Sequence, residues 1–221
     1  SGGQAARVLA AVRLRFKVAD DAEITLEGNP ESLTPDALEG FRCSGITRIS
    51  VGVQSLDDAV LAKVGRAHDA RGAQRAVNLV RESGFPEVSL DLIAGLPGEN
   101  LVLWPDTLRR AVALLPDHLS VYLLESDKDT PLGRAIRGGR TVVAGDDAMA
   151  ALYEQTVAVL DDAGFPLYEI SNFARPNHRS RHNLKYWTDA PYVGFGLGAH
   201  GYVGGERRAN RRDLDGYLGA L

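Results

Sequence analysis

Two stretches of the sequence decide the fold: Gly45-Ile-Thr-Arg-Ile-Ser-Val-Gly-Val-Gln-Ser55 and Val88-Ser-Leu-Asp-Leu-Ile-Ala-Gly-Leu-Pro-Gly98. Each contains a short aliphatic run (46–53 and 88–93) that stops at a small or turn-forming residue, which is typical of a buried strand. Helical periodicity fills the interval between them, over 57–64 and 70–83. A strand, a helical crossover and a second strand with short connections predict a parallel pair with right-handed crossover.

The same alternation extends in both directions. Strands are predicted at 23–27, 119–124 and 167–170, and further helices at 5–16, 34–44, 101–115, 145–163 and 213–221. Thr34 followed by Pro35 is a typical helix start, and Gly164 a typical helix end. Because no Rossmann-type glycine fingerprint accompanies these units, the sequence predicts an α/β fold: a partial (β/α) barrel, with a mostly parallel sheet and outer helices.

Composition narrows the class of protein. The chain has 221 residues and a formal net charge of −4, which argues against nucleic acid as the main partner, because phosphate binding usually leaves a basic footprint. No apolar stretch approaches the roughly 20 residues that a membrane span needs. The single cysteine, Cys43, fits a reducing cytoplasm and excludes a cluster or zinc site built on several thiolates of this chain. We therefore expect a cytoplasmic protein.

Polar residues follow the predicted strands where each one ends: Glu27, Gln54, Asp91 and Glu125. In a parallel barrel the carboxyl ends of the strands open toward the active site, so these side chains are expected to converge there. Carboxylates and an amide suit a ligand with hydroxyl and ammonium groups. Arg66 is a candidate clamp for a carboxylate. The alternative is that the acids cap helices or face solvent and that Arg66 is a surface arginine.

The sequence pattern changes after residue 170. The segment 171–205 has little helical periodicity, an aromatic patch His182-Asn-Leu-Lys-Tyr-Trp187 and a glycine-rich run ending Gly198-Ala-His-Gly201. Loops this long are usually functional or disordered, and the aromatic residues argue for function. Pro176 and Asn177 argue against a helix that would place His178 and His182 together as metal ligands. Four arginines at 207, 208, 211 and 212 are expected to form a solvated basic face.

Four ordered motifs resemble the oxygen-independent coproporphyrinogen III oxidase family of radical S-adenosylmethionine (SAM) proteins. They are Thr25-Leu-Glu-Gly-Asn-Pro30, the stretch 45–55, Leu61-Ala-Lys-Val-Gly-Arg-Ala-His68 and Leu90-Asp-Leu-Ile-Ala-Gly-Leu-Pro-Gly98. The resemblance covers essentially the whole chain. It implies a radical SAM-type barrel in which four residues contact the ribose and methionine portion of SAM: Glu27, Gln54, Arg66 and Asp91.

A second block resembles the haem-chaperone branch of that family, which carries H-N-x-x-Y-W and then G-A-H-G. The resemblance implies a chaperone that binds haem, with His182 as ligand to the haem iron, and delivers haem to acceptor proteins, with peripheral membrane contact during delivery. Three alternatives stay open. In the first, His182 bonds a backbone carbonyl while Tyr186 and Trp187 fill a hydrophobic seam. In the second, the protein is a coproporphyrinogen III oxidase that decarboxylates propionate side chains, and in the third it is a cluster-free remnant that binds no ligand.

The chain departs from the family at the iron–sulfur site. The family holds a [4Fe–4S] cluster on a C-x-x-x-C-x-x-C loop after its first strand, and that loop is absent here. The cluster is therefore a cofactor of the complete family protein, and radical chemistry is not expected from this chain alone. The expected organisation is a partial barrel over 1–170, then a segment over 171–221 that leads to a C-terminal domain.

Overall fold

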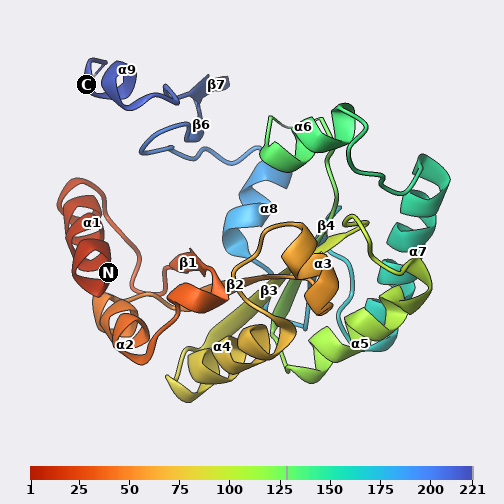
Figure 1. The fold of residues 1–221 in the computed structure, drawn as a ribbon. Coiled ribbons are helices and arrows are strands. Elements are labelled where there is room, and N and C mark those ends of the chain that lie inside the picture. The colour runs from red at the N-terminus through yellow and green to blue at the C-terminus, as the bar shows by residue number, and fades with distance from the viewer. Residues whose placement is uncertain (128, 221) are drawn as a thin grey trace. The chain divides into compact units, whose positions relative to one another are not determined.

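A computed structural model describes residues 1–127 and 129–220 of the chain (Figure 1). Its contacts divide the chain into two compact parts. The first, Ser1–Arg179, is called the sheet unit below, and the part from Ser180 onward the C-terminal unit. The predicted segment 171–221 therefore contains the last strand of the sheet as well as the C-terminal unit.

The sheet unit is built on five strands in the order β1-β2-β3-β4-β5. Their bounds are β1 Thr25–Gly28, β2 Arg48–Gln54, β3 Glu87–Ala94, β4 His118–Leu123 and β5 Asn172–Ala174. The first four strands run parallel, and β5 runs antiparallel to β4. This mostly parallel sheet with crossover helices confirms the predicted α/β fold class.

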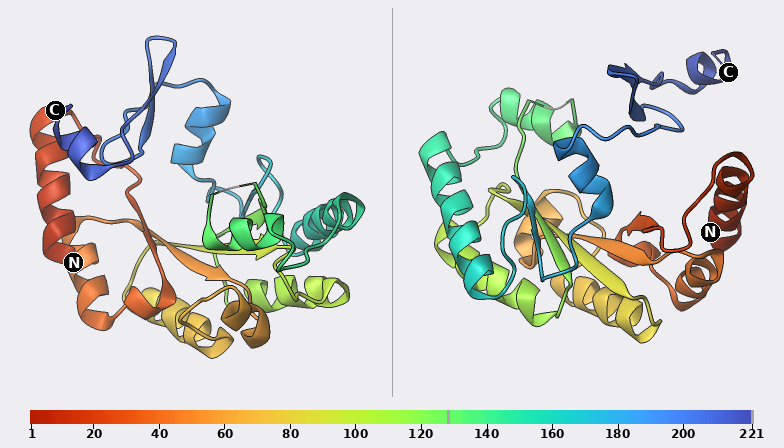
Figure 2. Two further views of the ribbon diagram at one scale, coloured as in Figure 1. Left: turned by 45° about the horizontal axis from the view of Figure 1, so that its top comes forward. Right: turned by 180° about the vertical axis from the view of Figure 1, so that it is seen from behind.

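Within the described residues of the sheet unit, seven helices precede, connect or cover these strands. They are α1 Gly2–Arg15, α2 Pro35–Ser44, α3 Asp58–Lys63, α4 Ala70–Glu82, α5 Trp104–Ala113, α6 Pro131–Arg137 and α7 Asp146–Asp162, with 3-10 turns η1 Pro30–Ser32 and η2 Leu101–Leu103. Side-chain caps define several starts: Thr34 accepts a hydrogen bond from Ala37 N and Asp69 from Gly72 N. Helices α4, α5 and α7 lie along one face of the sheet (Figure 2). Helix α6 was not predicted.

Strand alternation divides the sheet into an apolar and a polar face. On β2 and β3, one set of alternate residues is buried in the core against the helices: Ile49, Val51, Val53, Val88, Leu90, Leu92 and Ala94. The other set is mostly polar, and we call its side of the sheet the polar face: Arg48, Ser50, Gly52, Ser89 and Asp91, joined on β4 by His118, Ser120 and Tyr122. Because successive side chains point to opposite faces, one short apolar run supplies both the core and a polar surface.

The strand predicted at 167–170 is wrong. Leu167 makes only an isolated antiparallel bridge to Phe173, and the strand that joins the sheet is β5. A tight turn reverses the chain, since Tyr168 N donates to Asn172 O at 3.1 Å. The residues after this turn therefore run against β4. Hydrophobic periodicity does not report strand direction, which is why the sequence favoured a parallel strand.

The C-terminal unit contains helix α8 (Arg181–Trp187), the hairpin of β6 (His200–Val203) and β7 (Glu206–Ala209), and helix α9 (Leu214–Leu218). The expectation of little helix in 171–205 is wrong for α8. Pro176 and Asn177 precede the cap residue Ser180, whose hydroxyl accepts from Asn183 N, so they do not interrupt the helix. His178 stays outside α8. Within residues 1–127 and 129–220, no helix has the length and apolar character that a membrane span requires.

Candidate functional site

Two of the four predicted SAM-binding residues are carboxylates, and Asp91 is the more buried of the two. It lies on the polar face of β3 and accepts hydrogen bonds from Ser50 Oγ at 2.9 and 3.0 Å. Burial raises the pKa of Asp91 to about 6; hydrogen bonds from Ser50 and Ser120 act against this rise, and the charge of Glu27 adds to it. Glu27 is exposed and pairs in register with Ser50. Glu27 and Asp91 therefore lie on either side of Ser50.

Gln54 and Arg66 meet at Gly52, one step farther along the same face of β2. Gln54 ends β2 with φ 64°, in the left-handed region, where the register with β3 shifts. A Cβ built on Gly52 would lie 2.9 Å from Gln54 Nε2 and 3.4 Å from Arg66 Nη2. Arg66 Nη2 also donates to the Gly52 carbonyl at 2.9 Å and to Asn29 Oδ1 at 2.7 Å. Glycine at 52 is what lets both side chains approach the strand.

The structure thus brings Glu27, Asp91, Gln54 and Arg66 to the carboxyl-terminal part of one face, around Ser50 and Gly52. Carboxylates that accept hydrogen bonds lie beside a guanidinium that donates them, so the arrangement suits a zwitterionic ligand with hydroxyl groups. Sequence reasoning missed Ser50 and Asn29 as partners in this cluster. The alternation of side chains along the strand places Ser50 on the same face as Gly52, and this pattern could have identified Ser50 from the sequence.

Glu125, the fourth strand-end residue, lies outside this cluster. It is exposed and lies two residues beyond the end of β4. It lines a separate pocket together with Ile93, Tyr122 and Leu132. Its position after a strand did not suffice to predict its place, because the chain leaves the sheet before it.

A buried polar network fills the amino-terminal part of the polar face. Arg48 donates to Glu23 Oε2 and to the His178 carbonyl, both at 3.1 Å, and its Nη2 lies 3.5 Å from Glu87 Oε2. On the neighbouring strands, His118 is hydrogen-bonded through Nδ1 to Ser89 at 2.7 Å and through Nε2 to Tyr168 at 2.8 Å.

Burial, together with the charge of Arg48, lowers the pKa of His118 to about 3, so its ring is neutral near pH 7. Of the residues in this network, the sequence drew attention only to His178, and it did so as a possible metal ligand rather than as a partner of Arg48.

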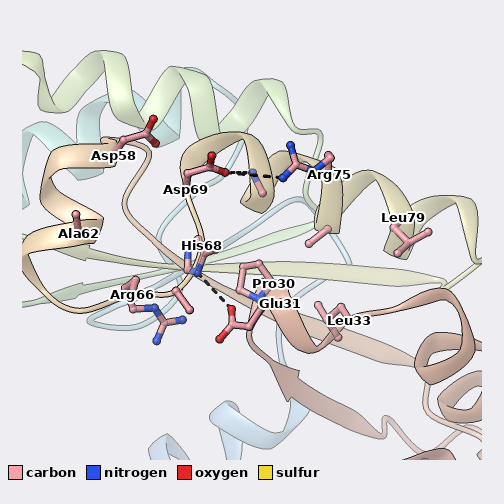
Figure 3. A pocket seen from close by; sticks show the side chains of 13 residues that line it. Pro30, Glu31, Leu33, Asp58, Ala62, Arg66, His68, Asp69, Arg75 and Leu79 are labelled. Carbon is pink, nitrogen blue, oxygen red and sulfur yellow. Dashed lines mark hydrogen bonds and ion pairs between the residues drawn. The ribbon is translucent and has the colours of Figure 1, made fainter.

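A pocket of about 650 Å³ lies between η1, α3 and α4 (Figure 3). Figure 3 shows His68 and Glu31 approaching one another, with Nδ1 and Oε2 3.5 Å apart, and Arg66 lines the same pocket. His68 Nε2 is hydrogen-bonded to the Val53 carbonyl at 3.0 Å. Arg66 belongs both to this pocket and to the cluster at Gly52. A ligand bound in the pocket would therefore affect the guanidinium that the cluster uses.

His182, the predicted haem ligand, is on α8 and exposed. Its Nε2 lies 2.8 Å from Tyr186 Oη, one turn later, and the two rings meet edge to face with centroids 5.2 Å apart. Tyr186 is 43% exposed and Trp187 54% exposed, which disagrees with the alternative in which they fill a hydrophobic seam. An accessible imidazole with aromatic neighbours has the chemistry of a haem ligand.

The donor set of this chain fits SAM but does not fit an iron–sulfur cluster. Cys43, the single cysteine, is exposed on α2. Among the described residues, no group of three or more histidine, cysteine, aspartate or glutamate side chains is placed to hold a metal ion. No step that requires the cluster is therefore assigned to residues of this chain.

Comparison with known proteins agrees with this geometry. The profile of the radical SAM superfamily matches residues 4–111. The haem chaperone HemW of Mycobacterium tuberculosis is 40% identical over 220 residues, covering 100% of this chain and 56% of that protein. HemW of Escherichia coli is 39% identical, covering 92% of this chain and 53% of its own length. The chain therefore spans about half the length of the curated relatives it matches.

A solved structure matches the fold as well. The coproporphyrinogen III oxidase HemN of Escherichia coli, whose title describes it as a radical SAM enzyme, superposes with a TM-score of 0.80 and 26% identity, covering 97% of this chain and 52% of that one. The sheet, the motifs along it and the relatives agree: the chain belongs to the radical SAM superfamily, as a HemW-like member of the family that also contains HemN.

Proposed function

We propose that this chain is part of a haem chaperone that binds haem through His182 and passes it to acceptor proteins. The observation that carries the proposal is the exposed His182 on α8, one turn from Tyr186 within the H-N-x-x-Y-W block. The two HemW relatives, which match 100% and 92% of this chain, support the same proposal. Haem is the cargo, and the residues of this chain hold it rather than transform it.

SAM is the second proposed ligand, at the cluster around Ser50 and Gly52. Arg66 would hold the methionine carboxylate, because a guanidinium binds carboxylates bidentately. Glu27 and Asp91 would accept hydrogen bonds from the ammonium and ribose hydroxyl groups, with Gln54 beside them. Bound SAM supplies radical chemistry only together with a [4Fe–4S] cluster, whose thiolate ligands this chain does not contain.

A test of the SAM site uses equilibrium dialysis with labelled SAM. Asp91→Asn and Arg66→Gln are each expected to weaken binding roughly tenfold or more, since each removes a charge-assisted hydrogen bond. Glu125→Gln is the matched control, because Glu125 also follows a strand but stands outside the cluster. Equal affinities in all three variants would remove these residues from the site.

The second candidate function is a coproporphyrinogen III oxidase. The observation that favours it is the likeness to HemN along almost the whole chain. The two functions differ in whether coproporphyrinogen is consumed. The complete, cluster-loaded protein is expected to show no turnover of coproporphyrinogen III, and oxidative decarboxylation at enzymatic rates would favour the oxidase instead.

The haem acceptors, a peripheral membrane contact during delivery and a cytoplasmic location belong to the same proposal. The single cysteine supports a reducing compartment. Arginines and exposed apolar side chains of the C-terminal unit, such as Phe195 and Leu197, support a contact with a membrane surface.

The first experiment is a haem titration followed through the Soret band. Wild-type protein is expected to bind saturably near one equivalent, and His182→Ala to lose or alter the band. His200→Ala is the matched control, because His200 is the other histidine of the C-terminal unit and is also exposed. Spectra that change in His200→Ala and not in His182→Ala would overturn the assignment of the ligand.

A further inference from the structure

A row of aromatic rings leads away from His182 within the C-terminal unit. Tyr186 meets Tyr192 edge to face, with centroids 4.7 Å apart, and Tyr192 meets Tyr202 at 6.4 Å with the ring planes tilted by 37°. The backbones of Tyr192 and Tyr202 also exchange two hydrogen bonds of 2.8 Å. These bonds fix the row to β6, so Tyr202 forms its far end.

Arg207 continues the row on β7. It is the register partner of Tyr202, and directly opposed residues of an antiparallel pair project from the same face. The guanidinium is exposed, and within the described residues it has neither a hydrogen bond nor an ion pair. The next residue, Arg208, pairs with Gly201, projects from the opposite face and is ion-paired with Glu206 at 2.8 Å.

The chemistry of the row matches two features of a haem molecule, its flat apolar ring and its carboxylate edge. A porphyrin is a flat apolar ring with two carboxylate side chains at one edge, away from the iron. Aromatic side chains pack on such a ring, and an arginine that lacks a partner binds a carboxylate through paired N–H donors. The axial candidate His182 and the cation Arg207 lie at opposite ends of this row, and in haem the carboxylates lie at one edge of the ring, away from the central iron.

We propose that Tyr186, Tyr192 and Tyr202 form a platform for the porphyrin and that Arg207 binds a haem carboxylate. This inference rests on the proposed haem function and adds the residues that would recognise the cargo by its carboxylate edge. The selectivity of the site then comes from Arg207, whereas His182 recognises the iron. Porphyrins without free carboxylates would bind less tightly.

The experiment compares haem with haem dimethyl ester, in which both carboxylates are esterified, on the full-length protein. Affinity is read from the Soret band and from quenching of tryptophan fluorescence. Wild-type protein is expected to prefer haem by roughly tenfold or more, the effect of one charge-assisted hydrogen bond. Arg207→Gln should lose this preference and keep the iron-dependent spectrum, whereas Arg208→Gln, the matched control, should behave as wild type.

The platform is tested by a second pair of variants. Tyr192→Leu removes the ring and should weaken binding of both haem and its ester, whereas Tyr192→Phe keeps the ring and should bind both more tightly than Tyr192→Leu does. Retention of the ester discrimination in Arg207→Gln, with haem still bound through His182, would overturn this inference alone. No haem binding by the wild-type protein would overturn the proposed function together with it.

Discussion

At the scale of single residues, the polar face holds two titratable groups whose pKa values move in opposite directions for the same physical reason. Burial disfavours the charged form, so the pKa of Asp91 rises to about 6 and the pKa of His118 falls to about 3. Both side chains are therefore neutral over a wider pH range than they would be in water. The contribution of each side chain to the free energy of unfolding therefore depends on pH.

Asp91→Asn is expected to stabilise the ligand-free chain at pH 7.5 by about 1–3 kcal/mol. The folded protein binds a proton at Asp91 more tightly than the unfolded chain does, with a pKa of about 6 against 3.8, so the wild type loses stability as pH rises through that interval. Asparagine keeps an acceptor for Ser50 without the charge. Urea unfolding at pH 7.5 and pH 4 measures the difference, which should nearly vanish at pH 4; a gap of equal size at both pH values would contradict the argument.

His118→Gln is expected to remove an acid sensitivity of the wild type. Because the folded-state pKa of His118 is about 3 and its ordinary value is 6.5, its contribution to stability is complete above pH 6.5 and is lost as pH falls toward 3. The stability of the wild type relative to the variant should drop by about 2 kcal/mol between pH 6.5 and pH 5. Asp91 titrates in both proteins and cancels in the comparison. A relative stability independent of pH would mean that His118 is not buried as a neutral ring.

At the scale of elements, close approaches of helices and strands depend on a few specific contacts. Gly52 lets the Gln54 amide and the Arg66 guanidinium reach β2, and Trp104 joins α5 to α7. The first contact serves the candidate site, whereas the second serves the core. Substitutions at the two positions should therefore separate ligand binding from stability.

Gly52→Ala is expected to lower SAM affinity roughly tenfold with a stability change within about 1 kcal/mol. The new methyl group would lie 2.9 Å from Gln54 Nε2, the far end of a flexible side chain, so the amide would move rather than the strand. Gly3→Ala in α1, where nothing lies within 4 Å of the added Cβ, is the control. Equilibrium dialysis with SAM and urea unfolding give the two readings, and a large loss of stability without loss of affinity would contradict the prediction.

Thr156→Val is expected to destabilise the sheet unit by about 1–3 kcal/mol, because it leaves the buried Trp104 Nε1–H without an acceptor. In the wild type that group donates to Thr156 Oγ1 at 2.8 Å. Trp104→Phe in the Thr156→Val background removes the orphaned donor. The loss in the double variant should then be smaller than the sum of the two single losses, as measured by a double-mutant cycle of urea unfolding. Additive losses would mean that the hydrogen bond does not couple α5 to α7.

At the scale of the whole molecule, the buried apolar side chains of the described residues all lie between Pro30 and Ala174. The hydrophobic core is therefore contained in the sheet unit. The C-terminal unit instead exposes many of its large apolar side chains, among them Trp187, Phe195 and Leu218. Stability and haem contact are accordingly assigned to different parts of the chain.

A chain shortened to residues 1–179 is expected to unfold cooperatively, with a stability within about 1 kcal/mol of the longer chain, because no core residue is removed. Urea unfolding followed by tryptophan fluorescence is a suitable measurement, since Trp104 remains in the core. Loss of the cooperative transition would show that the sheet unit depends on residues beyond Arg179.

Much of the sheet unit could be predicted from the sequence, because strand and helix periods are local properties. Strands β1 to β4, the cap residue Thr34 and the strand-end placement of Glu27, Gln54 and Asp91 all follow from residues within a few positions of one another. The assignment of His182 rested on a motif, and its role in haem binding stays a prediction.

The sequence by itself determined the fold class, its first four strands and the end of those strands at which a ligand would be sought. Only the tertiary structure decided the direction of β5, the network that joins Arg48 to His178 across 130 positions, and the alignment of Tyr192 and Tyr202 with Arg207. The physical reason is that hydrogen bonds and ring contacts between distant segments depend on where the chain reverses. Residue periodicity carries information about neighbours along the chain, whereas these partners become neighbours only after folding.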